Sequence, residues 1–130
     1  MTRHRLLLAA LIGYTGFLEI FSILPSKESV GEDCRLCWDV GNATANFLHF
    51  VVYAGLAWII YRYMESRGYP TRLVVIIAIF SSLAIGISNE FLQILVPGRS
   101  ANVSDGLLDM LGGIAGAWLA YRTRKPASLL

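Results

Sequence analysis

Side chains that could do chemistry are concentrated in the final third of the chain, in NEFLQILVPGRSANVSDGLLDMLGG, residues Asn89 to Gly113. Glu90 lies inside an apolar run, and Asp105 and Asp109 lie four residues apart where the next run begins. A carboxyl group deep in an apolar segment is costly unless it is paired. Two carboxylates one helical turn apart repel each other unless a proton, a cation or an arginine lies between them. These acids could therefore accept protons, bind a cation or contact a polar ligand.

The apolar runs also carry polar or small side chains in stripes at helical spacing. A charged group facing lipid is strongly unfavourable, so the stripes should face the interior of a helix bundle. Counted at about 1.5 Å per residue from the outward ends, Glu19, His49 and Glu90 lie roughly 7 to 10 Å deep and Asp109 somewhat less, which predicts one outward-opening pocket. The stripes are Thr15, Glu19, Ser22 and Ser26; Asn42, Asn46, His49 and Tyr53; Ser82, Gly86, Glu90 and Gln93; and Asp105, Asp109, Gly112 and Gly116.

The side chains of the predicted pocket leave several roles open. The catalytic candidates are Glu90, Asp109 and His49, although Glu90 could instead form a buried structural pair with Gln93, His49 or Arg99. Arg99, in the rim loop, could bind a phosphate or carboxylate through two parallel hydrogen bonds or simply pair with Asp105. The predicted ligand-binding set is Glu19, His49, Tyr53, Glu90, Gln93, Arg99, Asp105 and Asp109.

Two further kinds of site involve histidine and cysteine side chains: a metal site and a redox site. His49 with carboxylates would suit zinc or manganese, but no H-E-x-x-H motif is present and a hydrogen-bonded histidine is more common in a bundle, so we expect no metal and no cofactor. Cys34 and Cys37 form C-R-L-C in a loop predicted to face an oxidising compartment. They could form a small disulfide or remain an exchanging thiol pair.

The elements that must position these residues are membrane helices. Of the 130 residues, 55% are apolar and they are gathered in blocks. A membrane span needs roughly 20 mostly apolar residues, and the spans are expected at about 6–24, 45–61, 73–96 and 105–121. Short loops between them predict an all-α fold, a compact antiparallel four-helix bundle forming a single domain over residues 1–130. Gly112 with Gly116 and Ser82 with Gly86 should let the helices approach closely.

The charge distribution predicts the orientation. The net charge is only +2, but most arginines fall on one side of the expected spans, which places both termini in the cytoplasm. The first span could instead be read as a signal peptide, but it lacks a small-x-small cleavage site and contains Glu19. Scattered basic residues give no support for nucleic-acid binding. We expect a multi-pass membrane protein whose partners are membrane lipids.

One further pattern consists of Glu90, Gln93, Pro97, Gly98, Arg99, Asp105, Gly112 and Gly116, with His49 and Tyr53 in an earlier apolar run. This pattern resembles the VanZ-like family of small bacterial membrane proteins. The resemblance covers about the C-terminal two thirds of the chain and implies an integral protein of the bacterial cell membrane, in a family named for a member linked to low-level teicoplanin resistance. Two departures stand out: Asp109 replaces a frequent Asn, and the usual Asp-Lys pair before the histidine-bearing span is missing.

Three functions remain open at this point. The first is a binding protein whose pocket holds an anionic lipid-linked or cell-wall group, such as a lipid-linked cell-wall intermediate or a phospholipid headgroup, with an association with glycopeptide resistance. The second is a hydrolase or transferase acting on a lipid-linked phosphate or ester, with Glu90 or Asp109 as general base and His49 as partner. The third, a proton-coupled carrier, is disfavoured because no inverted repeat is detectable.

Overall fold

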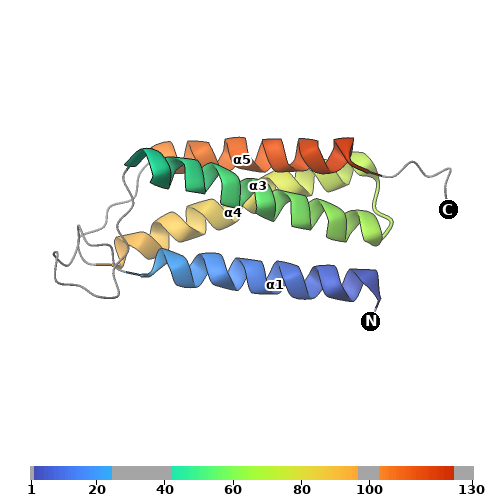
Figure 1. Ribbon diagram of the computed structural model, residues 1–130, viewed down its shortest axis with the longest axis horizontal. Coiled ribbons are helices and arrows are strands. Elements are labelled where there is room, and N and C mark those ends of the chain that lie inside the picture. Colours follow the sequence, from blue (N-terminus) through green and yellow to red (C-terminus); the bar gives the residue numbers. More distant parts are fainter. Residues whose placement is uncertain (1, 25–41, 97–102, 125–130) are drawn as a thin grey trace.

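The computed structural model describes residues 2–24, 42–96 and 103–124, and all regular structure in these ranges is helical. The helices are α1 (Arg3–Ser22), α3 (Asn42–Ser66), α4 (Thr71–Ile94) and α5 (Val103–Arg122). Each of them covers most of one expected span and extends beyond it by a few residues at its N-terminal end. The helices lie alongside one another, and the N-terminal end of α1 and the C-terminal end of α5 lie at the same end of the molecule (Figure 1).

The connection between α3 and α4 shows how the sequence ends one helix and starts the next. Gly68 has a positive φ of 80°, a conformation that costs glycine little. Its N–H donates to the carbonyl of Glu65 at 3.0 Å, and the N–H of Tyr69 donates to the carbonyl of Met64 at 3.3 Å, which is the Schellman pattern of a helix C-terminus. Pro70 then precedes the first residue of α4. This tight connection holds the two helices side by side.

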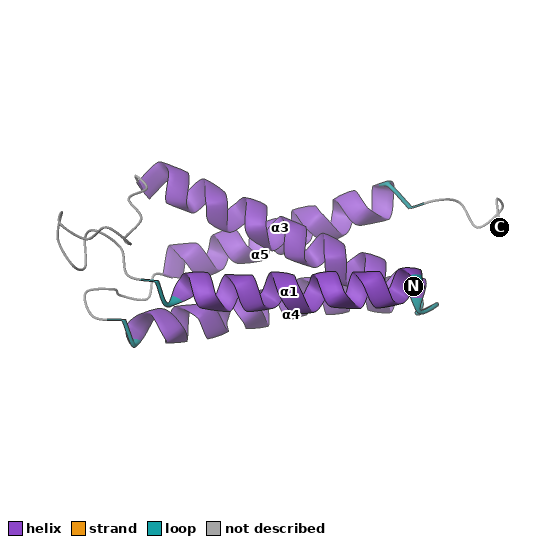
Figure 2. Ribbon diagram, turned by 60° about the horizontal axis from the view of Figure 1, so that its bottom comes forward, coloured by secondary structure: helices purple, strands orange, loops and turns teal. Residues whose placement is uncertain are grey.

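Helix α3 is the centre of the packing, because it contacts each of the other three described helices. α1 and α5 each pack against both α3 and α4. They do not contact each other within the described ranges. Figure 2 shows α3 and α5 crossing, with α1 alongside α4. The fully buried side chains along these interfaces include Leu56, Ala57, Tyr61, Val74 and Ala78.

The crossing of α3 and α5 depends on glycine. A Cβ atom added at Gly116 would overlap the backbone carbonyl oxygen of Ala54, and one added at Gly112 would overlap that of Phe50. Close backbone approach through small residues is how membrane helices gain packing contacts. The predicted packing role of this glycine pair is confirmed, and it fixes the register in which α5 presents its acids to α3.

Large apolar side chains cover much of the outside. Ile12, Phe17, Phe80, Phe91 and Trp118 are each more than half exposed, a surface suited to lipid. Three of the described helices are long and apolar enough to cross a membrane: Arg3–Ser22, Asn46–Ser66 and Thr71–Ile94. Helix α5 does not meet that criterion, because Asp105 and Asp109 reduce its apolar content. The expected fourth span therefore stays a prediction.

Candidate functional site

A buried ion pair joins α3 to α5. His49 Nδ1 lies 2.9 Å from Asp109 Oδ1, and His49 Nε2 lies 4.0 Å from Asp105 Oδ2. The two acids are one turn apart on α5, so that the imidazole lies between them and is flanked at both of its nitrogens. The Asp109 side chain is completely buried, whereas His49 keeps 20% of its side chain exposed. An imidazolium at this position would relieve the repulsion between the two carboxylates.

Helix α4 supplies the space for the Asp109 carboxyl group. A Cβ atom on Gly86 would lie 2.5 Å from Asp109 Oδ2 and 3.1 Å from its Cγ, so only glycine allows the carboxyl to fit here. Within the described residues Asp109 Oδ2 has no hydrogen-bond partner, and neither does the buried Ser82 Oγ. The carboxyl is therefore held by one histidine on one side and by close packing on the other.

A second polar pair lies beside the first. Asn89 Nδ2 donates a hydrogen bond to the hydroxyl of Tyr53 at 2.5 Å, and both side chains are almost fully buried. The Tyr53 ring stacks against His49 with the ring centroids 6.3 Å apart and the planes 14° from parallel. Tyr53 and His49, on neighbouring turns of α3, thus connect Asn89 of α4 with Asp109 of α5 in one polar cluster.

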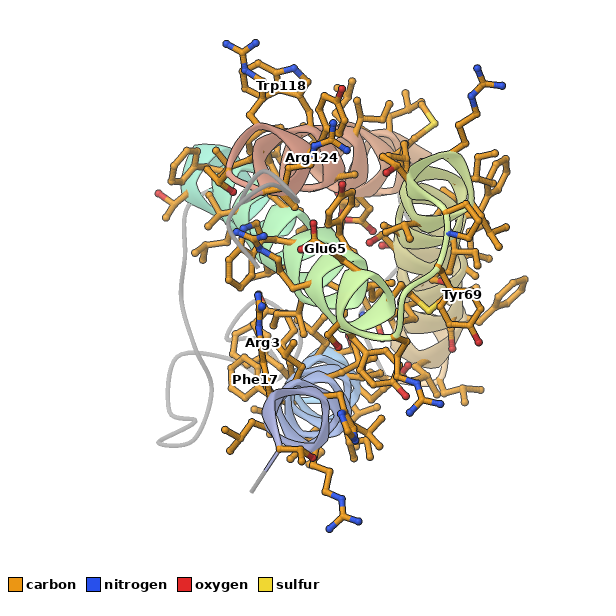
Figure 3. The ribbon with its side chains drawn as sticks, turned by 90° about the vertical axis from the view of Figure 1, so that its right-hand side faces the viewer. Arg3, Phe17, Glu65, Tyr69, Trp118 and Arg124 are labelled. Carbon is orange, nitrogen blue, oxygen red and sulfur yellow. The ribbon has the colours of Figure 1, made fainter. Side chains whose placement is uncertain are left out.

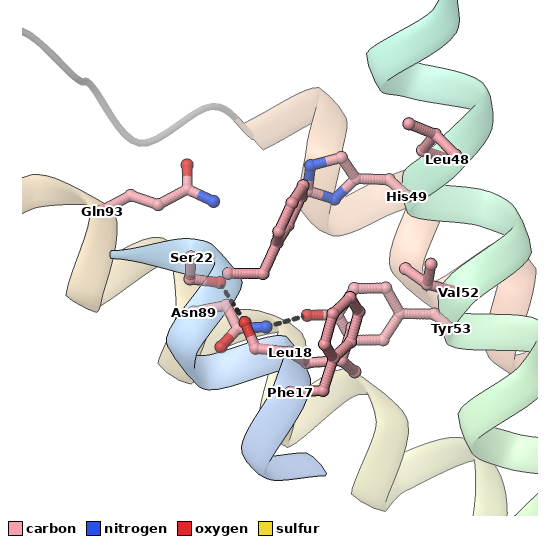
Figure 4. A pocket seen from close by; sticks show the side chains of 10 residues that line it. Phe17, Leu18, Ser22, Leu48, His49, Val52, Tyr53, Asn89 and Gln93 are labelled. Atoms are coloured by element: carbon pink, nitrogen blue, oxygen red, sulfur yellow. Dashed lines mark hydrogen bonds between the residues drawn. The ribbon is translucent and has the colours of Figure 1, made fainter. Parts of the chain in front are cut away.

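This arrangement borders a cavity of about 160 Å³ between α1, α3 and α4 (Figure 4). Most of its wall surface is apolar, although five of the ten lining residues carry a polar group. Its apolar part comes mainly from α1, while α3 and α4 supply most of the hydrogen-bonding groups. The lining residues are Phe17, Leu18, Phe21, Ser22, Leu48, His49, Val52, Tyr53, Asn89 and Gln93.

The structure divides the predicted site residues into groups. His49, Tyr53 and Gln93 line the cavity, whereas Asp105 and Asp109 approach His49 from α5 and do not line it. Glu19 and Glu90 are partly buried and also do not line it. Arg99, Cys34 and Cys37 lie outside the described residues.

Asn89 is the functional candidate that the sequence analysis missed. The stripe expected on α4 was Ser82, Gly86, Glu90 and Gln93. In the structure the buried face continues from Gly86 to Asn89, three residues on, and not to Glu90. The signal was present, since steps of four, three and four from Ser82 reach Asn89 and Gln93. Glu90 was predicted in place of Asn89 because it is charged, but its side chain is only partly buried.

The cluster does not have the form of a metal centre. No group of three histidine, cysteine, aspartate or glutamate side chains in the parts of the chain that the structure describes is arranged to hold a metal ion. What the arrangement offers instead is a set of hydrogen-bond donors and acceptors beside an apolar wall, with one imidazole oriented by a buried carboxyl group.

Comparison with known proteins gives one match. The family model described as VanZ/LLP1 matches residues 6–124, which is nearly the whole chain. No curated protein and no solved structure matches the sequence. The match extends well beyond the cavity and includes all four described helices.

Proposed function

The chain belongs to the VanZ-like family, and on that premise we propose that it is a bacterial envelope protein that binds a lipid-linked cell-wall group or a phospholipid headgroup in the cavity between α1, α3 and α4. In this proposal the four helices form an antiparallel bundle that crosses the cell membrane four times, with both termini in the cytoplasm. The cavity then opens in the outer half of the bilayer. The clustering of arginines at the end that holds both termini supports this orientation.

The mixed wall of the cavity is the observation that carries the proposal. Phe17, Leu18 and Phe21 form an apolar side that suits a hydrocarbon chain, while Asn89 and Gln93 face it with amide groups. A lipid-linked molecule has the same division, with an apolar chain joined to a hydrogen-bonding linkage. In this proposal Arg99 binds the anionic part of the ligand, because a guanidinium can bind phosphate through two hydrogen bonds.

The proposed consequence is protection against glycopeptides. A protein that holds a lipid-linked cell-wall intermediate alters how drugs of this class reach it, and the VanZ-like family takes its name from a teicoplanin-resistance protein. The amide groups in a mainly apolar cavity wall support binding of such a molecule, and no covalent step is needed for it.

Teicoplanin susceptibility of a sensitive Gram-positive host tests the proposal. We expect the wild type to raise the inhibitory concentration, and Gln93→Leu to abolish that increase at equal membrane abundance because it removes a buried amide from the cavity wall. Asn46→Leu is the matched control: it makes the same kind of change at an exposed position of α3, and protection should persist. Equal protection by all three proteins would contradict the proposal, and so would no protection by any.

A hydrolase or transferase is the second candidate, and the His49–Asp109 hydrogen bond is the observation that favours it. A carboxyl group that fixes one imidazole nitrogen leaves the other to act as a general base, here on a lipid-linked phosphate or ester. In that case His49→Gln eliminates turnover of a labelled lipid phosphate by the purified protein while the lipid still binds. If wild type shows no turnover under conditions where binding is measurable, the protein acts by binding alone.

A further inference from the structure

A second hollow lies at the other end of the molecule, on the surface between α4 and α5. Its volume is about 600 Å³, and its floor is apolar, with Val75, Ile76 and Ile79 from α4 and Ile114 and Trp118 from α5. It extends from Thr71 to Ile79 along α4, which is about 12 Å at the helical rise of 1.5 Å per residue. A groove of this shape along two apolar helices suits a hydrocarbon chain.

Two guanidinium groups lie at the mouth of this groove. Arg72 lines it directly. Arg124 Nη1 donates a hydrogen bond to Thr71 Oγ1 at 3.2 Å, and its guanidinium lies 4.4 Å from the centroid of the Tyr121 ring. Thr71 and Tyr121 both belong to the groove wall, so that Arg124 lies beside this end of the groove. Neither arginine has an acidic partner within 4 Å among the residues that the structure describes, unlike Arg62, which pairs with Glu65.

Aromatic side chains lie at the same end of the molecule as these two arginines. Trp118 is 60% exposed and points away from the bundle (Figure 3), and Arg122 lies over its ring at 5.5 Å. Tryptophan and tyrosine prefer the membrane–water boundary, where arginine reaches the headgroups. In the proposed four-span arrangement, the apolar floor lies in the hydrocarbon region and the two guanidinium groups lie at headgroup depth.

We propose that the α4–α5 groove is a binding site for an anionic phospholipid, with one acyl chain along the apolar floor and the phosphate between Arg72 and Arg124. The charge of the groove mouth selects the headgroup, since a zwitterionic lipid brings its own cation to two guanidinium groups that have no acidic partner among the described residues. The site is separate from the cavity between α1, α3 and α4, and it stands whether or not that cavity binds a cell-wall molecule.

Fluorescence of Trp118 tests the proposal directly. The full-length chain with Trp38→Phe and Trp58→Phe retains Trp118 alone, and it is reconstituted in phosphatidylcholine vesicles that contain a small fraction of phospholipid brominated in the acyl chain. We expect brominated phosphatidylglycerol to quench Trp118 at a several-fold lower mole fraction than brominated phosphatidylcholine. Arg72→Gln should reduce that preference about fivefold, the effect of one basic residue near a membrane surface.

Arg3→Gln is the control, because it removes the same charge at the same end of the molecule but from α1, which does not contact α5. Its preference should match that of the parent protein. The proposal is overturned if the two brominated lipids quench equally, if Arg3→Gln and Arg72→Gln reduce the preference equally, or if no lipid quenches Trp118. It is also overturned if glycerol 3-phosphate alone competes, since the site would then recognise a free phosphate. All residues changed are exposed or are replaced by a similar ring, and circular dichroism verifies the fold.

Discussion

At the scale of residues, one imidazole is the centre of the polar cluster. His49 lies between two carboxyl groups of α5, hydrogen-bonded to one and 4.0 Å from the other. Removing one partner from a buried pair leaves an uncompensated charge or an unpaired polar group, which costs more than the pair itself contributes. The pair also connects α3 to α5 next to the cavity, so changes at Asp109 should reach the cavity wall through His49.

A double-mutant cycle with His49→Gln, Asp109→Asn and the double variant measures this connection. We expect a coupling free energy of about 1 to 2 kcal/mol, near the upper end of values for polar pairs within membrane proteins. Reversible unfolding in mixed micelles, followed by circular dichroism, gives the free energy of each variant. The partly exposed Arg62–Glu65 pair is the control and should give less than about 1 kcal/mol. Strictly additive effects at His49 and Asp109 would mean that the hydrogen bond contributes nothing to the fold.

At the scale of elements, the contact between α3 and α5 decides the geometry of the site. Gly112 and Gly116 allow the two backbones to touch, and that contact sets the rotation and height at which Asp105 and Asp109 meet His49. α4 contributes in the same way, because Gly86 leaves room for the Asp109 carboxyl group. Small residues on two helices therefore position the acid as effectively as its hydrogen bond does.

Gly116→Ala should destabilise the protein by about 1 to 3 kcal/mol, the usual cost of overpacking a tight interface. The added methyl group meets the backbone of Ala54, which cannot rotate away as a side chain could. Thermal unfolding in detergent measures the effect. Gly106→Ala on the same helix is the control: nothing lies within 4 Å of its added Cβ, so we expect no loss of stability. Equal melting temperatures for the two variants would refute the close backbone contact.

At the scale of the whole molecule, the position of α5 relative to the bilayer determines the topology. Three described helices qualify as spans by length and composition, while α5 carries Asp105 and Asp109. Both acids face the bundle rather than its outer surface, with Asp109 fully buried and Asp105 beside His49. A helix whose acids are covered by its neighbours presents mainly apolar groups outward, and we therefore expect it to span the membrane with the others.

Single cysteines introduced at Thr2 and Leu129, in a chain with Cys34→Ser and Cys37→Ser, distinguish three spans from four. With four spans both cysteines are cytoplasmic, and an impermeant maleimide labels neither of them in intact cells but both in inverted membrane vesicles. With three spans, residue 129 lies outside and reacts in intact cells while residue 2 stays protected. Labelling at residue 129 alone in intact cells would rule out the four-span arrangement.

The sequence by itself determined the helices, because long apolar runs separated by glycine and proline can satisfy their backbone only as helices in lipid. It also identified His49 and Asp109 as candidates, since a charged group within such a run is rarely without a partner. The family pattern, carried by local spacing around Glu90 and Gln93, was readable in the same way, and the match to the family confirms it.

Only the tertiary structure decided which of these residues meet. Glu90 and Asn89 are neighbours in sequence, yet Asn89 is the one that lies 97% buried and bonded to Tyr53, because the packing of α4 against α3 turns that face inward. Residues three or four positions apart both lie on one face of a helix, so spacing from Gly86 allows either Asn89 or Glu90. The choice depends on contacts between segments far apart in the chain, and a periodic pattern contains no information about the rotation of one helix against another.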